Sequence, residues 1–130
     1  MAGSDSLVDA ARKASEHAFA PRSNFRVGAA LETHDGRIFT GCNIENATYG
    51  LTICAERVAI FKALSEGRRA FRRMAVVAEP DEPTPPCGAC RQILWEMCGD
   101  IEVVMANLQK VHRTMRTTDL LPLPFDERLL

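Results

Sequence analysis

Three cysteines and one glutamate offer the clearest chemistry in this sequence. The segment Cys54-Ala55-Glu56 supplies a thiol and a carboxylate, and Pro86-Cys87-Gly88-Ala89-Cys90 supplies two further thiols. Cys87 and Cys90 are three residues apart, so on the first turn of a helix they share a face and can bind one metal ion. Cys54 would be the third ligand, brought to them by the fold. Three protein ligands are typical of a catalytic zinc, which keeps its fourth position for water.

Glu56 is suited to proton transfer beside such a metal. It lies two residues after Cys54, so on a helix its side chain points to a different side from the ligand. A carboxylate placed there can take a proton from zinc-activated water and return it to a leaving group. A glutamate in the first turn of a helix is ordinarily a solvated residue favoured by the helix dipole. Beside three candidate ligands, we interpret Glu56 as the catalytic residue.

The charge of the thiolates calls for a compensating cation. Three thiolates and Zn²⁺ leave one net negative charge, which makes the metal a poorer Lewis acid, and a cation that donates hydrogen bonds to the sulfurs would restore it. Arg57 is the first candidate for this role and Arg91 is the second. For both residues, an ordinary surface arginine is the alternative interpretation.

Other uses of the cysteines are weaker hypotheses. The sequence has five cysteines, an odd number, and lacks a secretion signal. Both observations argue against a disulfide framework. Cys42 and Cys98 lie in apolar contexts and are interpreted as small buried hydrophobic residues. Neither they nor the three histidines have a ligand-like spacing that would close the site as a structural zinc. A redox C-x-x-C would leave Cys54 and Glu56 without a role.

Composition narrows the class of protein. The 130 residues predict a single domain, residues 1–130, with an ordinary globular composition of 46% hydrophobic and 25% charged residues. A net charge of −1 gives no reason to expect a nucleic-acid or membrane partner, and the lack of an aromatic-rich, basic strand groove disfavours a polynucleotide substrate. No apolar run approaches a membrane span, and the N-terminus lacks signal-peptide features. We therefore expect a cytoplasmic protein.

Hydrophobic periodicity predicts the elements that must position the site. Helix Leu7–Ala18 is amphipathic, with Ser6 and Asp9 resembling a capping box at its start. Strands are predicted over Phe25–Leu31, Ile38–Cys42, Met74–Ala78, Ile101–Ala106 and, more weakly, Val111–Met115, and further helices over Ile53–Ser65, Cys87–Cys98 and Thr118–Leu121. This order is a layered α/β pattern.

Three local signals refine this picture. The Asp35-Gly36 pair between the first two strands predicts a hairpin turn, because such a turn needs positive φ. Gly28 within the first strand permits close approach of another backbone or of a ligand. Both cysteine segments fall at the start of a predicted helix, where free N–H groups and the helix dipole lower thiol pKa values.

Four segments together resemble the small, homotetrameric cytidine deaminases. They are Ser23–Leu31, Gly41–Ala47, Cys54–Arg57 and Pro86–Gln92, and the likeness runs in order and spacing through Leu120-Leu121-Pro122. The resemblance implies a three-layer α/β/α sandwich with a five-stranded mixed sheet. It also implies one zinc ion per chain, with Cys54, Cys87 and Cys90 at the positions of the family's ligands and Glu56 at that of its proton shuttle.

The reaction implied by the resemblance is hydrolytic. Cytidine and 2′-deoxycytidine would be converted to uridine and 2′-deoxyuridine with release of ammonia, in pyrimidine salvage. The family's ribose contacts match Asn43 and Glu45, which would bind the 3′-hydroxyl. Phe25 would pack against the nucleoside, and the backbone of Ala55 would meet the pyrimidine carbonyl.

The resemblance further implies sites at subunit interfaces of a homotetramer. Tyr49 would enter a neighbouring subunit's site near the 5′ end of the sugar. In the family a tail aromatic often crosses the interface onto the base, and Phe125 is the candidate here. The chain departs from the family at Arg22, where a tyrosine is usual, and this change could alter the rim of the site.

Two alternatives to a cytidine substrate stay open at this point. A modified pyrimidine, either a nucleoside antibiotic or an isocytosine-like base, is the alternative within the enzyme class. Asn43 and Glu45 argue against a bare base, because without a ribose their polar groups would go unpaired. The alternative of another class is a non-catalytic, zinc-stabilised interaction module, against which Glu56 and the absence of a fourth ligand argue.

Overall fold

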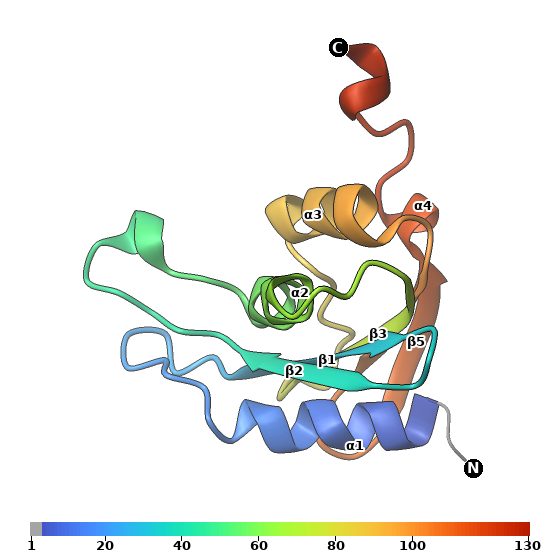
Figure 1. Cartoon of the computed structure of the whole chain (residues 1–130). Helices are drawn as coiled ribbons and strands as arrows, with labels where there is room; N and C mark the ends of the chain where they lie inside the picture. The colour runs from blue at the N-terminus through green and yellow to red at the C-terminus, as the bar shows by residue number, and fades with distance from the viewer. Residues whose placement is uncertain (1–3) are drawn as a thin grey trace.

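A five-stranded mixed sheet with helices on both faces organises the chain (Figure 1). The computed structural model describes residues 4–130. The strands are β1 (Val27–Thr33), β2 (Ile38–Cys42), β3 (Phe71–Ala78), β4 (Glu102–Ala106) and β5 (Val111–Arg116). The helices are α1 (Ser4–Ser15), α2 (Ala55–Ser65), α3 (Gly88–Cys98) and α4 (Thr117–Leu120), with 3₁₀ turns η1 (Tyr49–Leu51) and η2 (Glu127–Leu129). None of the helices over residues 4–130 has the length and apolar character to cross a membrane.

The strand order is β2-β1-β3-β4-β5. Neighbouring strands run antiparallel except β3 and β4, which are parallel and are connected through α3. Register places Val27 opposite Ala78 and Gly28 opposite Cys42, so the start of β1 and the ends of β2 and β3 share one edge of the sheet. The loop after β3 leaves from this edge and leads to Cys87.

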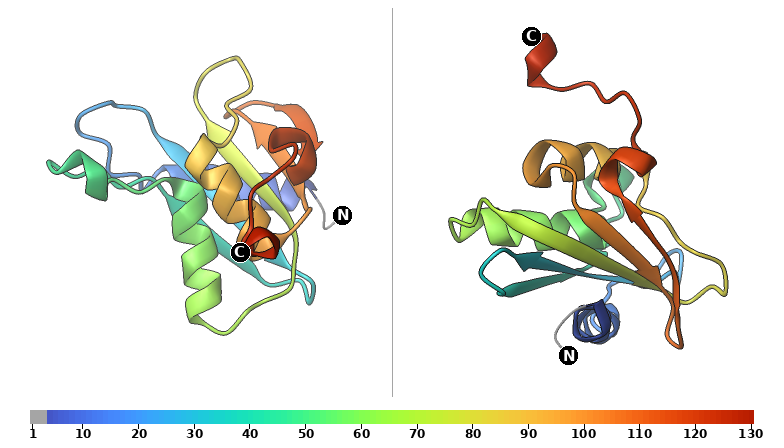
Figure 2. Two further views of the ribbon diagram at one scale, coloured as in Figure 1. Left: turned by 90° about the horizontal axis from the view of Figure 1, so that it is seen from above. Right: turned by 90° about the vertical axis from the view of Figure 1, so that its right-hand side faces the viewer.

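Each face of the sheet has its own core. Helix α1 packs on one face through Leu7, Val8 and Ala11, which contact small and β-branched residues of β1, β3 and β4. Helices α2, α3 and α4 cover the other face, and the side view shows these layers (Figure 2). The expected three-layer α/β/α architecture with a five-stranded mixed sheet is confirmed.

Two glycines set how closely the helices approach the sheet. A Cβ at Gly28 would stand 2.0 Å from the carbonyl oxygen of Ala11, so the predicted close approach is made by the backbone of α1. A Cβ at Gly41 on β2 would stand 2.5 Å from the carbonyl oxygen of Ala55. The start of α2 therefore lies directly against the sheet, and this contact fixes the height of Cys54 and Glu56 above it.

The expected limits of the first helix were wrong at both ends. Helix α1 begins at Ser4 and ends at Ser15, three residues before the predicted end at Ala18. Ser6 therefore lies inside the helix and cannot cap it. The Asp9 carboxylate instead accepts a hydrogen bond from Arg12 at 3.0 Å, an i,i+3 ion pair on the helix surface.

Two strands also differ from prediction, and for identifiable reasons. The first strand begins at Val27 rather than Phe25, because the Asn43 side chain occupies the polar backbone groups that a ladder would use there. Strand β3 begins at Phe71 rather than Met74. The added residues include Arg73, which forms a largely buried ion pair with Glu32 on β1 at 2.8 Å.

Candidate active site and metal centre

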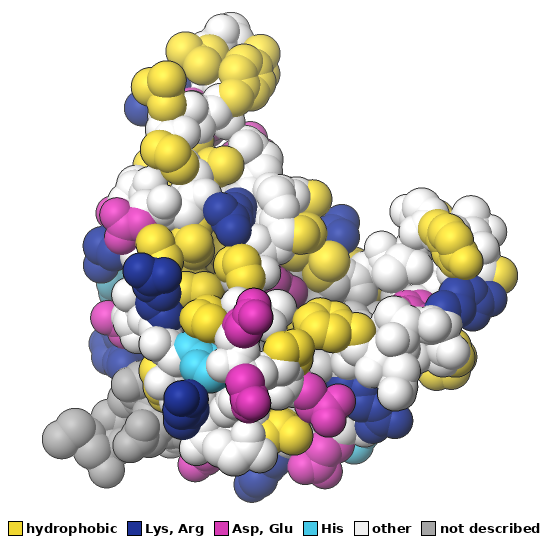
Figure 3. Space-filling model, turned by 180° about the vertical axis from the view of Figure 1, so that it is seen from behind, with side chains coloured by type: hydrophobic (Ala, Val, Ile, Leu, Met, Phe, Trp, Pro, Cys, Tyr) yellow, Lys and Arg dark blue, Asp and Glu magenta, His cyan; other side chains and the backbone are white. Residues whose placement is uncertain are grey.

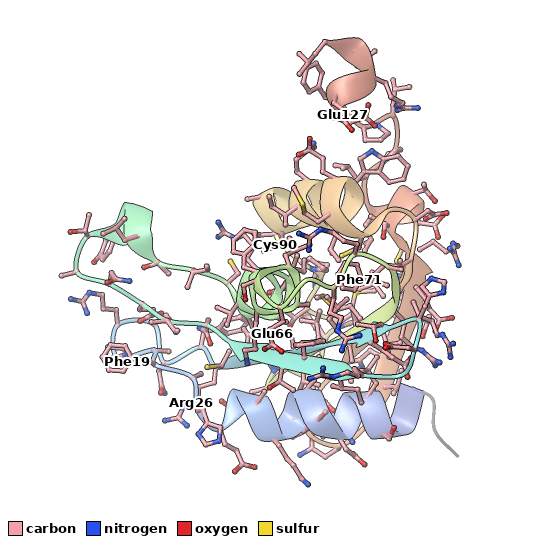
Figure 4. The ribbon with its side chains drawn as sticks, viewed as in Figure 1. Phe19, Arg26, Glu66, Phe71, Cys90 and Glu127 are labelled. Carbon is pink, nitrogen blue, oxygen red and sulfur yellow. The ribbon has the colours of Figure 1, made fainter. Side chains whose placement is uncertain are left out.

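Three cysteine sulfurs meet where α2 and α3 begin. Cys54 is the N-cap of α2, Cys87 is the N-cap of α3, and Cys90 lies in the first turn of α3. The three sulfurs lie within 4.8 Å of one another, and the Cys54 and Cys87 sulfurs are 3.8 Å apart. Figure 4 labels Cys90 beside α2 and α3. The predicted convergence of these residues is present in the structure.

The cluster fits a tetrahedral zinc ion. Zn–S bonds of about 2.3 Å place two sulfurs of such a site about 3.8 Å apart. Among the described residues, the metal-binding group consists of these three cysteines, without a fourth His, Cys, Asp or Glu. Cys42 and Cys98 lie elsewhere, and burial raises the pKa of the Cys98 thiol to about 12. Three sulfur donors with an open position are the arrangement of a catalytic zinc.

The electrostatics of the cluster favour a thiolate at Cys54. The hydrogen bond from Cys90 lowers the pKa of Cys54 to about 5, and Arg57 and Cys87 act in the same direction. The same hydrogen bond raises the pKa of Cys90. Without metal, Cys54 therefore forms a thiolate readily.

Arg57 supplies a cation to this charge. Its Nη2 donates to the sulfur of Cys54 at 3.4 Å, and this contact raises the pKa of the guanidinium. Arg91, the second candidate, instead donates from Nε to the carbonyl oxygen of Pro86 at 2.8 Å and from Nη1 to that of Leu120 at 2.7 Å. Its role is to hold the loop before Cys87 and the end of α4.

Glu56 is buried, with 4% of its surface exposed, yet it borders the cavity in front of the cysteines. Burial, and to a lesser degree the negative charge of Cys54, raises the pKa of Glu56 to about 7. A carboxyl group with this pKa can accept and release a proton at neutral pH. The structure therefore places a carboxyl group that can exchange protons in the same cavity wall as Cys54 and Cys87.

A cavity of about 170 Å³ opens in front of Glu56. Its walls come from the loop before β1 and the first residue of β1, the residue after β2, the segment leading into α2 and the first turn of α2, β3, and the loop before α3. The lining residues are Phe25, Val27, Asn43, Thr52, Ile53, Cys54, Ala55, Glu56, Val76, Thr84, Pro85 and Cys87. Pockets for drug-sized ligands are typically about 300–1,000 Å³. The enclosed space suits only part of a nucleoside, so the rest of it would extend into open surface.

Three further residues predicted to bind the substrate border this cavity or the one next to it. Phe25 and Asn43 line it, and Asn43 also holds the neighbouring backbone by donating to Phe25 O at 2.7 Å. Glu45 instead borders a neighbouring cavity of about 290 Å³ together with Arg22, Ser23, Tyr49 and Thr52. Thr52 borders both cavities, so they adjoin.

Neither Tyr49 nor Phe125 lines the cavity in front of Glu56 in its own chain, although Tyr49 borders the adjoining one. Tyr49 is 75% exposed on η1, and Phe125 is 59% exposed on the C-terminal segment, which rises beyond α3 (Figure 1). The structure keeps both aromatic residues available to another molecule.

Sequence reasoning missed several lining residues. Thr84 and Pro85 belong to the proline-rich loop, and their position just before a metal ligand was a usable signal. Val76 gave no signal beyond membership of a buried strand. Ser23 was noticed only as part of a motif, although its hydroxyl bonds to Glu45.

Sequence comparison identifies relatives over most of the chain. Residues 1–107 match the family described as "Cytidine and deoxycytidylate deaminase zinc-binding region". A cytidine deaminase of Halalkalibacterium halodurans is 52% identical over 117 residues, covering 89% of this chain and 89% of that protein. A cytidine deaminase of Sporosarcina psychrophila is 47% identical, covering 95% and 91%. A blasticidin-S deaminase of Bacillus cereus is 33% identical, covering 76% of each chain.

Structural comparison agrees. The 1.6 Å crystal structure of cytidine deaminase from Burkholderia pseudomallei superposes with a TM-score of 0.91 and 51% identity, covering 95% of this chain and 99% of that one. Cytidine deaminase from Mycobacterium tuberculosis gives a TM-score of 0.83 and 37% identity, covering 97% and 99%. This chain therefore belongs to the zinc-binding cytidine and deoxycytidylate deaminase family.

Proposed function

We propose that this protein is a zinc-dependent hydrolase that deaminates cytidine and 2′-deoxycytidine as free nucleosides, releasing ammonia and uridine or 2′-deoxyuridine. The observation that carries the proposal is a buried, near-neutral glutamate bordering a cavity beside three convergent cysteine sulfurs. The named relatives at about half identity support the choice of cytidine.

Zinc held by Cys54, Cys87 and Cys90 would supply Lewis-acid activation of water at the carbon that bears the amino group. Glu56 would accept one proton from the attacking water and deliver it to the neighbouring ring nitrogen, and it would then pass the second proton of that water to the departing amine, which leaves as ammonia. The Arg57 guanidinium would offset the charge of the sulfurs through its contact with Cys54. Burial keeps Glu56 out of bulk water while it performs these transfers.

The remaining residues would orient the nucleoside. Phe25 would pack on the base, and the backbone of Ala55 would meet the pyrimidine carbonyl. Because the cavity holds only part of the substrate, the sugar would extend toward Asn43 and Glu45, at the side where the adjoining cavity begins. The side-chain amide of Asn43 and the carboxylate of Glu45 suit a ligand that carries hydroxyl groups better than they suit a bare base.

The proposed setting is pyrimidine salvage in the cytoplasm by a homotetramer. The exposed aromatics on η1 and on the C-terminal segment, Tyr49 and Phe125, support sites completed by neighbouring subunits.

Ultraviolet monitoring of zinc-loaded protein tests the function directly. The panel contains cytidine and 2′-deoxycytidine beside cytosine, isocytosine and blasticidin S, the last because one relative bears that name. We expect fast turnover of the two nucleosides and little of the others. Preferential turnover of a base or of the antibiotic would show that this compound, and not cytidine, is the substrate. If no compound were turned over, the deaminase proposal would be overturned.

A further inference from the structure

Ser23 joins two walls of the candidate site. Its hydroxyl donates to Oε2 of Glu45 and accepts a hydrogen bond from the backbone N–H of Phe25 at 3.0 Å. The backbone N–H groups of Arg22 and Ser23 donate to the other oxygen, Oε1, at 2.8 and 3.2 Å. A continuous chain of hydrogen bonds thus runs from the Glu45 carboxylate to the backbone that carries the Phe25 ring.

Phe25 depends on these side chains because it lies outside the sheet ladder. Strand β1 begins only at Val27, and the carbonyl oxygen of Phe25 accepts from Asn43 at 2.7 Å. Asn24, just before it, has a left-handed backbone with φ of 56° and donates to Ala20 O at 3.0 Å. Ser23 on one side and Asn43 on the other therefore fix where the ring stands.

The Glu45 carboxylate retains capacity for one more donor. An ionised carboxylate offers about four acceptor positions on its two oxygens. Two donors occupy Oε1 and one occupies Oε2, so one position remains, on Oε2. The bond from Ser23 holds the pKa of Glu45 below its ordinary value, so the group is ionised and accepts hydrogen bonds at neutral pH.

We infer that Ser23 is a positioning residue that couples a sugar hydroxyl bound at Oε2 of Glu45 to the placement of Phe25 beside the base. A hydroxyl at this oxygen fixes the carboxylate, the carboxylate fixes the Ser23 hydroxyl, and that hydroxyl fixes the Phe25 amide. The inference rests on the proposed function, since it takes a nucleoside as the occupant. It makes recognition of the sugar and of the base interdependent.

Kinetics of three variants test the role of the hydroxyl. Ser23→Ala removes one link of this hydrogen-bonded chain. We therefore expect KM for cytidine to rise about five- to thirtyfold, with kcat within about twofold of wild type. Ser23→Thr keeps a hydroxyl and should restore KM. Ser65→Ala is the control, because the Ser65 hydroxyl also donates a hydrogen bond, to the carbonyl oxygen of Lys62 at 2.7 Å, but does so on an exposed helix end away from the site. A fall in kcat alone, or no rescue by threonine, would overturn the inference.

A double-mutant cycle tests whether Ser23 acts through Phe25. In a Phe25→Ala background, Ser23→Ala should raise KM little further, because the ring that it positions is gone. The coupling to the sugar predicts a smaller Ser23→Ala effect with 2′,3′-dideoxycytidine than with cytidine. The inference would be contradicted if the effects of the two substitutions on KM were fully additive, or if Ser23→Ala raised KM equally for the two substrates.

Amide hydrogen exchange gives a readout that needs no turnover. Ser23→Ala should accelerate exchange at the Phe25 amide while exchange at Ala29 and Ala30 in β1 stays unchanged. If wild-type protein fails to deaminate cytidine but Phe25 exchange responds, the proposed function fails and the Ser23–Phe25 link stands. If exchange at Phe25 does not respond, the link itself is wrong whatever the activity.

Discussion

Glu56 combines burial with access to the cavity, and the two properties together set its chemistry. Exposure would return its pKa to the ordinary range of a carboxyl group, whereas complete enclosure would cut it off from substrate. At 4% exposure, with a pKa of about 7, both protonation states are populated near neutrality. This is the balance that a group needs in order to take a proton and give it back.

Glu56→Gln should abolish this exchange while leaving the metal site intact. We expect kcat to fall by about 10²–10⁴ or more, the usual contribution of a positioned acid–base group. Zinc content, measured by atomic absorption, should equal that of wild type because Glu56 is outside the sulfur cluster. Loss of zinc together with activity would show that Glu56 is a ligand instead.

Arg57→Ala removes the cation that donates to Cys54. Groups that bond to metal ligands typically change activity or metal affinity by about 10–100-fold, and we expect a loss of kcat in that range. Arg113→Ala is the matched control, because Arg113 is an exposed arginine on β5. Equal behaviour of the two variants in a cytidine assay would remove Arg57 from the site.

Thiol labelling after zinc removal tests the electrostatics of the cluster. A pKa lowered to about 5 means that Cys54 is largely thiolate at pH 6, whereas Cys98, with its pKa raised to about 12, stays protonated until strongly alkaline pH. Chelator-treated protein should therefore incorporate iodoacetamide at Cys54 at pH 6 and none at Cys98. Mass spectrometry of the digest measures both, and labelling of Cys98 at this pH would contradict the assignment.

At the scale of elements, the site depends on how α2 meets the sheet. Gly41→Ala would place a methyl group 2.5 Å from the carbonyl oxygen of Ala55 and 2.6 Å from the backbone nitrogen of Ala59, so α2 must move. We expect a loss of about 1–3 kcal/mol in the free energy of unfolding, as for overpacked cores, together with weaker zinc binding.

Gly28→Ala is the control for this change, since the same crowding there acts on α1, on the opposite face. It should destabilise the protein to a similar degree in denaturant titrations but leave zinc affinity closer to wild type. Equal losses of zinc affinity in the two variants would show that general destabilisation, and not the position of α2 on the sheet, determines zinc binding.

Much of the fold was predictable because apolar runs and turns were strong local signals. The buried strand around Met74 and the hairpin turn at Asp35-Gly36 needed no knowledge of the rest of the chain. The errors arose where distant side chains decide the outcome. Asn43 shortens β1 by bonding to the backbone before it, and Arg73 extends β3 by pairing with Glu32.

The same division applies to the site. The types and spacing of Cys54, Cys87 and Cys90 predicted a zinc site with Glu56 beside it, and the structure brings these residues together. The sequence left Arg57 and Arg91 as first and second candidates for the compensating cation, and nothing local shows that carbonyl oxygens of Pro86 and Leu120 lie within reach of Arg91. The bond from Ser23 to Glu45 likewise joins segments 22 residues apart and follows only from the fold.

At the scale of the whole molecule, two segments project from the body with apolar tips. The space-filling view shows hydrophobic side chains gathered on both projections (Figure 3). On the C-terminal segment, Leu123 is 99% and Leu130 93% exposed; on η1, Leu51 is 67% exposed. Large apolar side chains exposed on a projection mark a surface for association.

Deleting residues 123–130 tests this interpretation. If the segment is an arm that contacts neighbouring subunits, the truncated protein should form smaller assemblies than wild type in sedimentation velocity. Leu108→Ala serves as control, because Leu108 is also exposed but lies after β4, away from both projections. An unchanged assembly mass after truncation would show that the tail does not hold subunits together.

The position of the ligands at the starts of two different helices has a thermodynamic consequence. Cys54 begins α2 and Cys87 begins α3, so an ion bound between them holds together two elements that an unfolded chain leaves apart. By mass action, a ligand that binds only the folded state adds about 2.7 kcal/mol of stability at a hundredfold excess over its Kd. The melting temperature of this protein should therefore rise with free zinc, which makes resistance to unfolding a readout of zinc supply.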